Sequence, residues 1–248
     1  ANVINRQTGI PLEKILKDAV STEQARFARE SSSGLFYITG YYVEHEIKHS
    51  GIGVLYKARE LKTDQPLVIK TLVPQGDVDL YKVYIFQREL NIIRQLDHKH
   101  IVQFFEHGKT DGTFYFILEF VEGMDLAKFI RSKGGRVALE EAVPIMLGIL
   151  DGLAYAHHAK ITLQDAEGNR EIFEGIVHRN LKPQNILLMR KEDLWFPKIT
   201  DFGLSKSFEA AGLTNITTPG DVLGTPIYWP REQITHYRYL DPATDVFS

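Results

Sequence analysis

The spacing of apolar residues changes along the chain from a strand pattern to a helix pattern. Behind Pro11 the apolar positions recur at helix spacing with charges between them, which predicts an amphipathic helix near the N-terminus. Residues 35–70 are rich in β-branched and aromatic side chains, broken by turn residues, and indicate strands. Residues 78–96 return to helix spacing, and two more strands are expected near 101–107 and 113–120.

The second half of the chain is mainly helical in its pattern. Helix spacing begins beyond Gly123, at residues 125–132 and again at 139–159. Residues 161–174 interrupt it with two short strands around Asp165–Asn169, whose turn chemistry predicts a β-hairpin. The whole pattern indicates an α+β protein, in which a sheet-rich lobe is followed by a helical lobe.

Three parts are expected on this basis. They are an N-terminal extension over residues 1–34, a small lobe over 35–119 and a large lobe over 120–248 that carries the hairpin. We interpret the N-terminal helix first as packing on its own domain and the hairpin as a tolerated surface element. The alternative for both is that they contact a partner protein.

The composition excludes several classes of protein. The 248 residues are 44% hydrophobic and 25% charged, which is typical of a globular protein. The formal net charge of -3 gives no general attraction to nucleic acid or to an anionic membrane. The chain has no cysteine, so a disulfide scaffold and a thiolate zinc site are excluded. No apolar run approaches the ~20 residues that span a bilayer, and we expect a cytoplasmic domain.

Several residues with phosphate or metal chemistry follow one another in order. Lys70 ends a strand and Glu89 lies in the middle of the next predicted helix, so that the pair could hold an ammonium group against phosphates. The segment His178–Asn185 precedes an apolar strand, and Asp201 opens the tripeptide Asp-Phe-Gly. Asn185 and Asp201 carry oxygen ligands of the kind that Mg²⁺ prefers. Each string alone is a weak signal, but their order and spacing together are specific.

Together these residues resemble the catalytic domain of Ser/Thr protein kinases over residues 36–248. The segment 178–185 is similar to the catalytic loop H-R-D-L-K-P-x-N, and 201–203 to the D-F-G motif. Lys182 is the choice of Ser/Thr kinases, and Gly224–Tyr228 is similar to the segment that receives their substrate. The resemblance implies a bilobal fold with a small antiparallel-sheet lobe and a mostly helical lobe. It also implies transfer of the ATP γ-phosphate, with Mg²⁺, to a Ser or Thr of a protein substrate.

The resemblance assigns a role to each matching residue. Lys70 would contact the α- and β-phosphates and pair with Glu89, Lys182 would steady the transferred phosphate, and Asn185 and Asp201 would bind Mg²⁺. The residues that would surround the nucleotide are Gly51, Gly53, Leu55, Val68, Leu118, Glu119, Val121 and Leu187. Among them the backbone groups of Glu119 and Val121 would face adenine, with Leu118 as the gatekeeper and Leu187 as the floor.

An activation loop is implied between the D-F-G motif and the substrate segment. It would run from about 204 to 223, with Thr214, Thr217 and Thr218 as candidate phosphorylation sites and Arg179 as the cation that receives the phosphate. For any single one of these threonines, an ordinary polar loop residue is the better interpretation.

Asn180 is the first departure from the family pattern, which has Asp at this position as the catalytic base. An amide keeps the shape and can hold a hydrogen bond, but it cannot accept the proton. We therefore expect this form of the domain to be catalytically inactive. Both an engineered exchange and a natural pseudokinase would give this pattern. The other catalytic residues are all retained, which favours the former.

The loop expected to cover the nucleotide also departs from the family pattern. The pattern G-x-G-x-x-G falls on Lys48–Gly53, where the last Gly matches and Gly51 is additional. Lys48 and Ser50 crowd the approach of phosphates, although Lys48 adds a positive charge. Val68 stands where the family usually has Ala above adenine. These changes favour weakened or unusual nucleotide binding, and they support the alternative of a pseudokinase scaffold that acts by binding proteins.

The last residues resemble the start of the long central helix of the large lobe. Glu232 is retained from the A-P-E motif, and Asp245 would tie that helix to the catalytic loop. A large lobe without the rest of this helix would expose an apolar face, so we expect the natural protein to continue beyond Ser248. A kinase for small molecules is a further alternative, but Lys182-Pro183 counts against it.

Overall fold

The computed structural model describes residues 38–50, 53–72, 90–110, 113–164, 170–202, 226–235 and 241–248. The strands of the first half are β1 (Tyr41–Ser50), β2 (Gly53–Glu60), β3 (Pro66–Leu72), β4 (Phe104–Thr110) and β5 (Thr113–Glu119). The strands of the second half are β6 (Gly123–Asp125), β7 (Lys160–Gln164), β8 (Arg170–Glu174), β9 (Ile186–Lys191) and β10 (Leu194–Ile199). The helices are α3 (Leu126–Ser132), α4 (Leu139–His158), α6 (Arg231–Thr235) and α7 (Ala243–Phe247), with 3-10 turns at Pro183–Asn185 and Pro226–Tyr228.

The small lobe is a five-stranded antiparallel sheet in the order β1-β2-β3-β5-β4. Because side chains alternate along each strand, the sheet buries two separate apolar clusters, one on each face. One face carries Leu72, Phe114, Phe116 and Leu118, and the helical end at residues 90–93 packs on it through Leu90. The opposite face carries Val43, Tyr56, Ala58, Leu67, Ile69 and Ile117. The lobe is thus stabilised independently on both sides.

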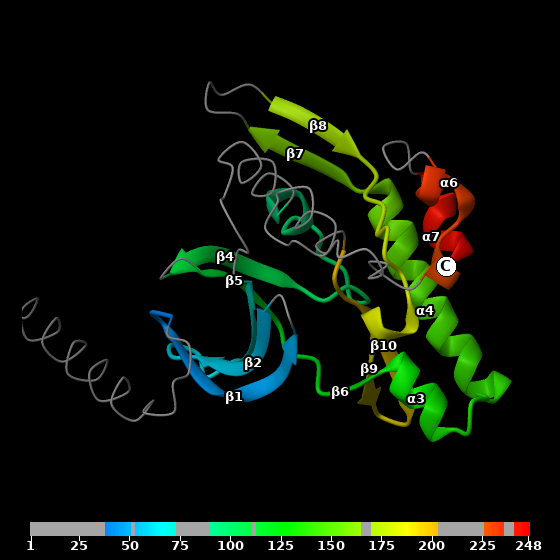
Figure 1. Cartoon of the computed structure of the whole chain (residues 1–248), viewed down its shortest axis with the longest axis horizontal. Coiled ribbons are helices and arrows are strands. Elements are labelled where there is room, and N and C mark those ends of the chain that lie inside the picture. The colour runs from blue at the N-terminus through cyan, green and yellow to red at the C-terminus, as the bar shows by residue number, and fades with distance from the viewer. Residues whose placement is uncertain are drawn as a thin grey trace, which may run out of the picture.

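The large lobe is organised around α4, with a second small sheet between this helix and the first sheet (Figure 1). The helix buries Ile145, Ile149 and Leu153 at helix spacing against β9 and β10, which belong to a sheet in the order β10-β9-β6. A further apolar stripe on α4 remains exposed and consists of Leu139, Val143, Met146, Leu147 and Leu150. Among the described residues no helix is long and apolar enough to cross a membrane.

The two lobes are joined through the segment that leads into β4. The backbone N–H of Val102 donates to the carbonyl of Ile199 at 2.8 Å, and the N–H of Ile199 donates to the carbonyl of His100 at 2.8 Å. Ile101 and Ile199 form an isolated parallel bridge. The strand β10 is therefore attached to the small lobe by backbone hydrogen bonds just before the chain reaches Asp201.

An antiparallel pair, β7 and β8, lies where the turn chemistry predicts a hairpin, and it projects beyond the end of α4 (Figure 1). Ile161 on its inner face is buried in the core of the large lobe. The side-chain amide of Gln95 donates to the carbonyl of Thr162 at 3.2 Å and accepts from its N–H at 3.3 Å. Gln95 thus anchors β7 to the segment that follows the helix ending at residue 93.

Some elements differ from the sequence-based expectation. The strand expected from residue 101 begins at Phe104, because Ile101 bridges to β10 instead. The strand β10 was not predicted, since Pro197 interrupts its pattern; the sheet tolerates this proline because β10 is an edge strand. The N-terminal extension at 1–34 and most of the helix predicted at 78–96 lie outside the described residues.

Gly53, at the start of β2, is required by the close packing of two strands. A Cβ atom on Gly53 would overlap the carbonyl oxygen of Thr71 on the neighbouring strand. Thr71 also holds this strand end through its hydroxyl, which accepts from the N–H of Val54 at 3.1 Å. Close approach of two backbones is one of the few situations that require glycine within a strand.

We therefore predict that Gly53→Ala lowers the free energy of unfolding by about 3 kcal/mol, because the strands must separate to admit the methyl group. The control is Gly40→Ala, where nothing lies within 4 Å and the cost is the positive φ of 92° alone, about 1 kcal/mol. Urea unfolding measures both. Equal stability of the two variants would contradict the prediction.

Candidate functional site

Lys70 and Asp201 meet at the junction of the two lobes. Lys70 lies on β3 and Asp201 follows β10, and Lys70 Nζ lies 2.8 Å from Asp201 Oδ1. Burial by itself would raise the pKa of the Asp201 carboxyl, but the ammonium groups of Lys70 and Lys182 outweigh it and hold the pKa below its usual range. Asp201 is therefore a carboxylate at neutral pH. The pairing of Lys70 with Glu89 stays a prediction, because Glu89 lies outside the described residues.

The catalytic-loop segment is held by one buried carboxylate, that of Asp245 on α7. Asp245 Oδ2 accepts from the N–H of His178 at 2.7 Å and from Nε2 of His157 at 2.8 Å, and Oδ1 accepts from the N–H of Arg179 at 2.9 Å. Asp245 is 2% exposed, so its charge is compensated by these three donors. The expectation that Asp245 ties its helix to the catalytic loop is confirmed, whereas the contribution of His157 from α4 was not predicted.

The backbone of Arg179 is fixed on both sides. Its φ of 65° lies in the left-handed region, which is strained for a residue with a side chain. The N–H donates to Asp245, and the carbonyl accepts from Nε2 of Gln233 on α6 at 2.7 Å. Within the described part of the chain, Nε of Arg179 is buried without a partner. The activation loop that would supply one lies outside this part.

His178 has a neutral ring in a defined tautomer. Its Nε2 donates to the carbonyl of Thr200 at 2.8 Å, and Nδ1 accepts from the N–H of Asn180 at 3.2 Å. Burial lowers the pKa of His178, which keeps the ring neutral. The ring also packs against Phe202, with 4.6 Å between centroids. His178 thus ties the loop to the segment that carries Asp201.

Asn185 and Asp201 fit the donor set expected for Mg²⁺. Nδ2 of Asn185 donates to the carbonyl of Asn180 at 2.8 Å, which turns Oδ1 of the amide away from that carbonyl. Lys70 engages Oδ1 of Asp201, which leaves Oδ2 for another contact. The described residues contain no group of three or more His, Asp or Glu side chains that could hold a metal alone. At nucleotide sites Mg²⁺ is commonly held by few protein oxygens together with phosphate oxygens.

Lys182 lies in the same cluster of charges. Burial is the main cause that lowers its pKa, and the positive charges of Lys48 and Lys70 lower it further, against the attraction of Asp201. The structure therefore brings Lys70 and Lys182 together around the Asp201 carboxylate, with Lys48 close enough for its charge to act on Lys182. This arrangement attracts a polyanion.

The apolar residues predicted to surround adenine also gather in one place. Val68 lies directly opposite Leu118 in the pair β3–β5. Val68, Val121 and Leu187 pack, half-buried, against the cluster that contains Leu118. Leu55 lies opposite Lys70 in the pair β2–β3, so it shares this face of the sheet. Gly51 lies outside the described residues.

Glu119 has a second contact that sequence reasoning missed. Its Oε2 accepts from Nζ of Lys198 at 2.8 Å and from the N–H of Gln103 at 3.1 Å. The side chains of Lys198 and Glu119 are 12% and 26% exposed, so the pair is largely desolvated. The carboxylate of Glu119, at the end of β5, thus attaches the connection between the lobes to β10. Its partner on β10, Lys198, lies three residues before Asp201.

The comparison with known families agrees with this geometry. The family model described as "Protein kinase domain" matches residues 41–248 of the chain. The chain belongs to the protein kinase domain family. The bilobal α+β fold implied by the sequence is thereby confirmed.

The kinase domain is similar in sequence to bacterial Ser/Thr protein kinases. It is 28% identical over 208 residues to Serine/threonine-protein kinase PknL of Mycobacterium tuberculosis, which covers 84% of this chain and 46% of that protein. It is 31% identical over 193 residues to PrkC of Bacillus subtilis, covering 78% of this chain and 26% of that protein. The chain thus spans less than half the length of these relatives.

Solved structures show the same fold. The crystal structure of the PknI kinase domain of Mycobacterium tuberculosis has a TM-score of 0.60 at 20% identity, covering 86% of this chain and 72% of that one. Rad53 in complex with AMP-PNP has a TM-score of 0.59 at 24% identity, covering 84% of this chain and 45% of that one. At this level of identity the likeness concerns the fold.

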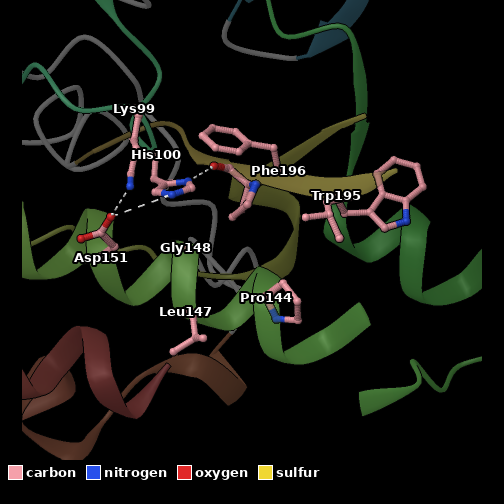
Figure 2. Close-up of a pocket in the computed structure, with 10 residues that line it drawn as sticks. Lys99, His100, Pro144, Leu147, Gly148, Asp151, Trp195 and Phe196 are labelled. Atoms are coloured by element: carbon pink, nitrogen blue, oxygen red, sulfur yellow. Dashed lines mark hydrogen bonds and ion pairs between the residues drawn. The ribbon is translucent and has the colours of Figure 1, made fainter. Parts of the chain in front are cut away.

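A separate hollow of about 450 Å³ lies between α4 and β10 of the kinase domain (Figure 2). None of the residues predicted to bind nucleotide or metal lines it. Asp151 accepts from Nζ of Lys99 at 3.1 Å at one end of the hollow. Nδ1 of His100 donates to the carbonyl of Pro197 at 2.8 Å, and its ring stacks on Phe196. These contacts join α4, β10 and the segment before β4.

We predict that Glu119 and Lys198 are energetically coupled by about 1–2 kcal/mol, because removal of either leaves a partly buried charge unpaired. A double-mutant cycle with Glu119→Gln and Lys198→Met, read by urea unfolding, measures this coupling. The control cycle uses Lys160 and Glu174, an ion pair whose side chains are 75% and 70% exposed, where the coupling should stay below about 0.5 kcal/mol. Similar values in both cycles would refute the prediction.

We also predict that His100 makes the kinase domain sensitive to acid. Burial lowers the pKa of His100, and the nearby Lys99 and His98 lower it further, against Pro197 and Asp151. The unfolded chain therefore takes up a proton below about pH 6.5 that the folded state resists, and stability falls as the pH drops. The difference between the unfolding free energies at pH 7.5 and at pH 5.5 should be smaller in His100→Asn than in the parent protein. The reduction is at most about 1.4 kcal/mol per pH unit, which is the slope that one proton contributes. An unchanged difference would contradict this.

Proposed function

We propose that this chain is the catalytic domain of a Ser/Thr protein kinase, which binds Mg·ATP between its lobes and faces a Ser or Thr of a protein substrate. The observation that carries the proposal is the contact of Lys70 with Asp201, surrounded by Lys182 and Asn185. It combines cations for phosphates with oxygen ligands for a metal in one cluster. The similarity to PknL and PrkC supports the acceptor class. We place the domain in the cytoplasm, where ATP is available.

The apolar wall beside this cluster supports adenine as the base. Val68, Leu118 and Leu187 contact one apolar cluster on the sheet face that also bears Lys70. Adenine would lie against these side chains, with the backbone of Glu119 and Val121 at its edge. The bound complex of Rad53 with AMP-PNP supports this use of the fold. Mg²⁺, held by Asn185 and Asp201, would neutralise phosphate charge.

The proposed reaction forms one bond to phosphorus and breaks one, and it moves one proton. The oxygen of the acceptor hydroxyl attacks the γ-phosphorus of ATP, and the bond from this phosphorus to the β,γ-bridging oxygen breaks. ADP leaves with the electron pair of that bond, and the hydroxyl proton passes to a base. Lys70 and Lys182 would stabilise the negative charge on the phosphates throughout.

Asn180 occupies the position of that base. Its backbone is held in place, since its N–H donates to His178 and its carbonyl accepts from Asn185. An amide oxygen at this position can orient a hydroxyl but cannot take the proton at neutral pH. We infer that the site binds nucleotide and is nearly inactive in phosphate transfer in this form.

A scaffold that acts through protein binding is the second candidate. The same Asn180, together with Lys48 and Ser50 in the nucleotide loop, favours it. In that case the ordered catalytic loop would serve to hold a conformation that a partner protein recognises.

We predict that Asn180→Asp raises phosphate transfer from ATP by about 10²–10⁴-fold, the usual contribution of a positioned general base. The measurement is incorporation of labelled γ-phosphate into the protein itself and into a general Ser/Thr substrate, with Mg²⁺ present. The change is nearly isosteric, so folding should be preserved.

The control adds Asp201→Asn to the restored protein, which should abolish transfer because the metal ligand and the partner of Lys70 are both lost. Folded protein that neither transfers phosphate nor binds ATP in either form would rule out the kinase proposal. The scaffold would then be the better account.

A further inference from the structure

Lys48 occupies an unusual place in the sheet. It lies near the end of β1, where the family resemblance has the first glycine of the phosphate loop. In the pair β1–β2 it lies directly opposite Leu55, and in the pair β2–β3 Leu55 lies directly opposite Lys70. The two irregularities of β1 fall between Val43 and His45 and between Glu46 and Lys48, so the pairing from Lys48 onward is regular. Lys48, Leu55 and Lys70 therefore form one row across three strands.

Directly opposite residues of antiparallel strands point to the same face of the sheet. Lys48 consequently shares the face of Lys70, whose ammonium group contacts Asp201. Two strand spacings of about 4.8 Å separate the two lysine backbones by roughly 10 Å. A long and flexible lysine side chain can bridge much of that gap toward the same ligand.

The electrostatics agree with this placement. The charges of Lys48 and Lys70 both act on Lys182, across the cleft on the catalytic loop. Among the described residues, no carboxylate forms an ion pair with Lys48. The carboxylate at the centre, Asp201, is engaged by Lys70. Among the described residues, three lysines in this region therefore face one carboxylate.

We propose that Lys48 is a phosphate-binding residue, which contacts the phosphates of the nucleotide with its ammonium group in place of the close backbone approach that glycine permits. This inference rests on the proposed function, since it assumes that the cleft takes ATP. Lys48 then determines specificity: it favours nucleotides by their number of phosphates and adds nothing for the nucleoside.

The physical reason is charge complementarity at a partly open site. A charge-assisted contact between an ammonium group and a phosphate is stronger than a neutral hydrogen bond. Because Lys48 is exposed, salt screens part of the attraction. We therefore expect a moderate effect that grows from ADP to ATP and declines with ionic strength.

The test compares the dissociation constants of ATP, ADP and adenosine for the protein and for Lys48→Gln, by calorimetry at low and high salt. Lys48→Gln should weaken ATP binding about 5–20-fold at low salt, ADP less, and adenosine not at all. Lys48→Arg should retain most of the affinity. The matched control is Lys62→Gln, which removes the same charge from the exposed turn between β2 and β3 and should leave all three constants unchanged.

The outcomes separate this inference from the proposed function. Equal weakening of ATP and adenosine would mean that Lys48 acts on the shape of the loop, and this would overturn the inference. ATP binding that is unchanged in Lys48→Gln would overturn it as well, while the kinase proposal would stand. A parent protein that binds no ATP would overturn both together, and this result is recognised before any variant is made.

Discussion

The buried carboxylate of Asp245 is the interaction on which the arrangement of the site depends. It accepts hydrogen bonds from the backbone of His178 and Arg179 and from the ring of His157, and it is almost fully removed from water. A buried charge of this kind is tolerated only when its donors are fixed in position. The hydrogen bonds to this carboxylate also hold Arg179 in a left-handed conformation that would otherwise relax. The carboxylate and the strained loop thus require each other, and the loop is ordered as a consequence.

The remaining parts of the site are joined to this loop by contacts between lobes. His178 connects the loop to the backbone of Thr200, and the next residue, Asp201, reaches across to Lys70 of the first sheet. On the other side of the cleft, Glu119 is bound to Lys198 of the same strand that leads to Asp201. The residues proposed to face adenine and to hold Mg²⁺ are therefore positioned relative to one strand, β10. Movement of the lobes would have to break a largely desolvated ion pair as well as surface contacts.

The sequence predicts those features that have a local signal. The sequence predicts the catalytic loop, the D-F-G segment and the hairpin at 161–174, because turn chemistry and motif spacing depend on residues that are close together in the sequence. The two ion pairs of the cleft were not found, since their partners are 79 residues apart for Glu119 and Lys198 and 131 residues apart for Lys70 and Asp201. The sequence around a lysine or glutamate in a strand does not indicate which residue will be its ion-pair partner. Only the fold, in which β3, β5 and β10 converge, brings these charges together.

The departures from the family pattern act in one direction on the charge of the cleft. Asn180 removes a negative charge where the family has Asp, and Lys48 adds a positive charge where it has Gly. Both changes favour a bound polyphosphate in the ground state by reducing repulsion and increasing attraction. Neither helps the transferred group more in the transition state, and Asn180 removes the proton acceptor that the transition state requires. Binding that is equal in the ground state and the transition state does not accelerate a reaction. On the proposed function, the two substitutions together would shift the domain from transferring the phosphate toward holding the nucleotide, so that slow transfer and nucleotide affinity would have the same electrostatic origin.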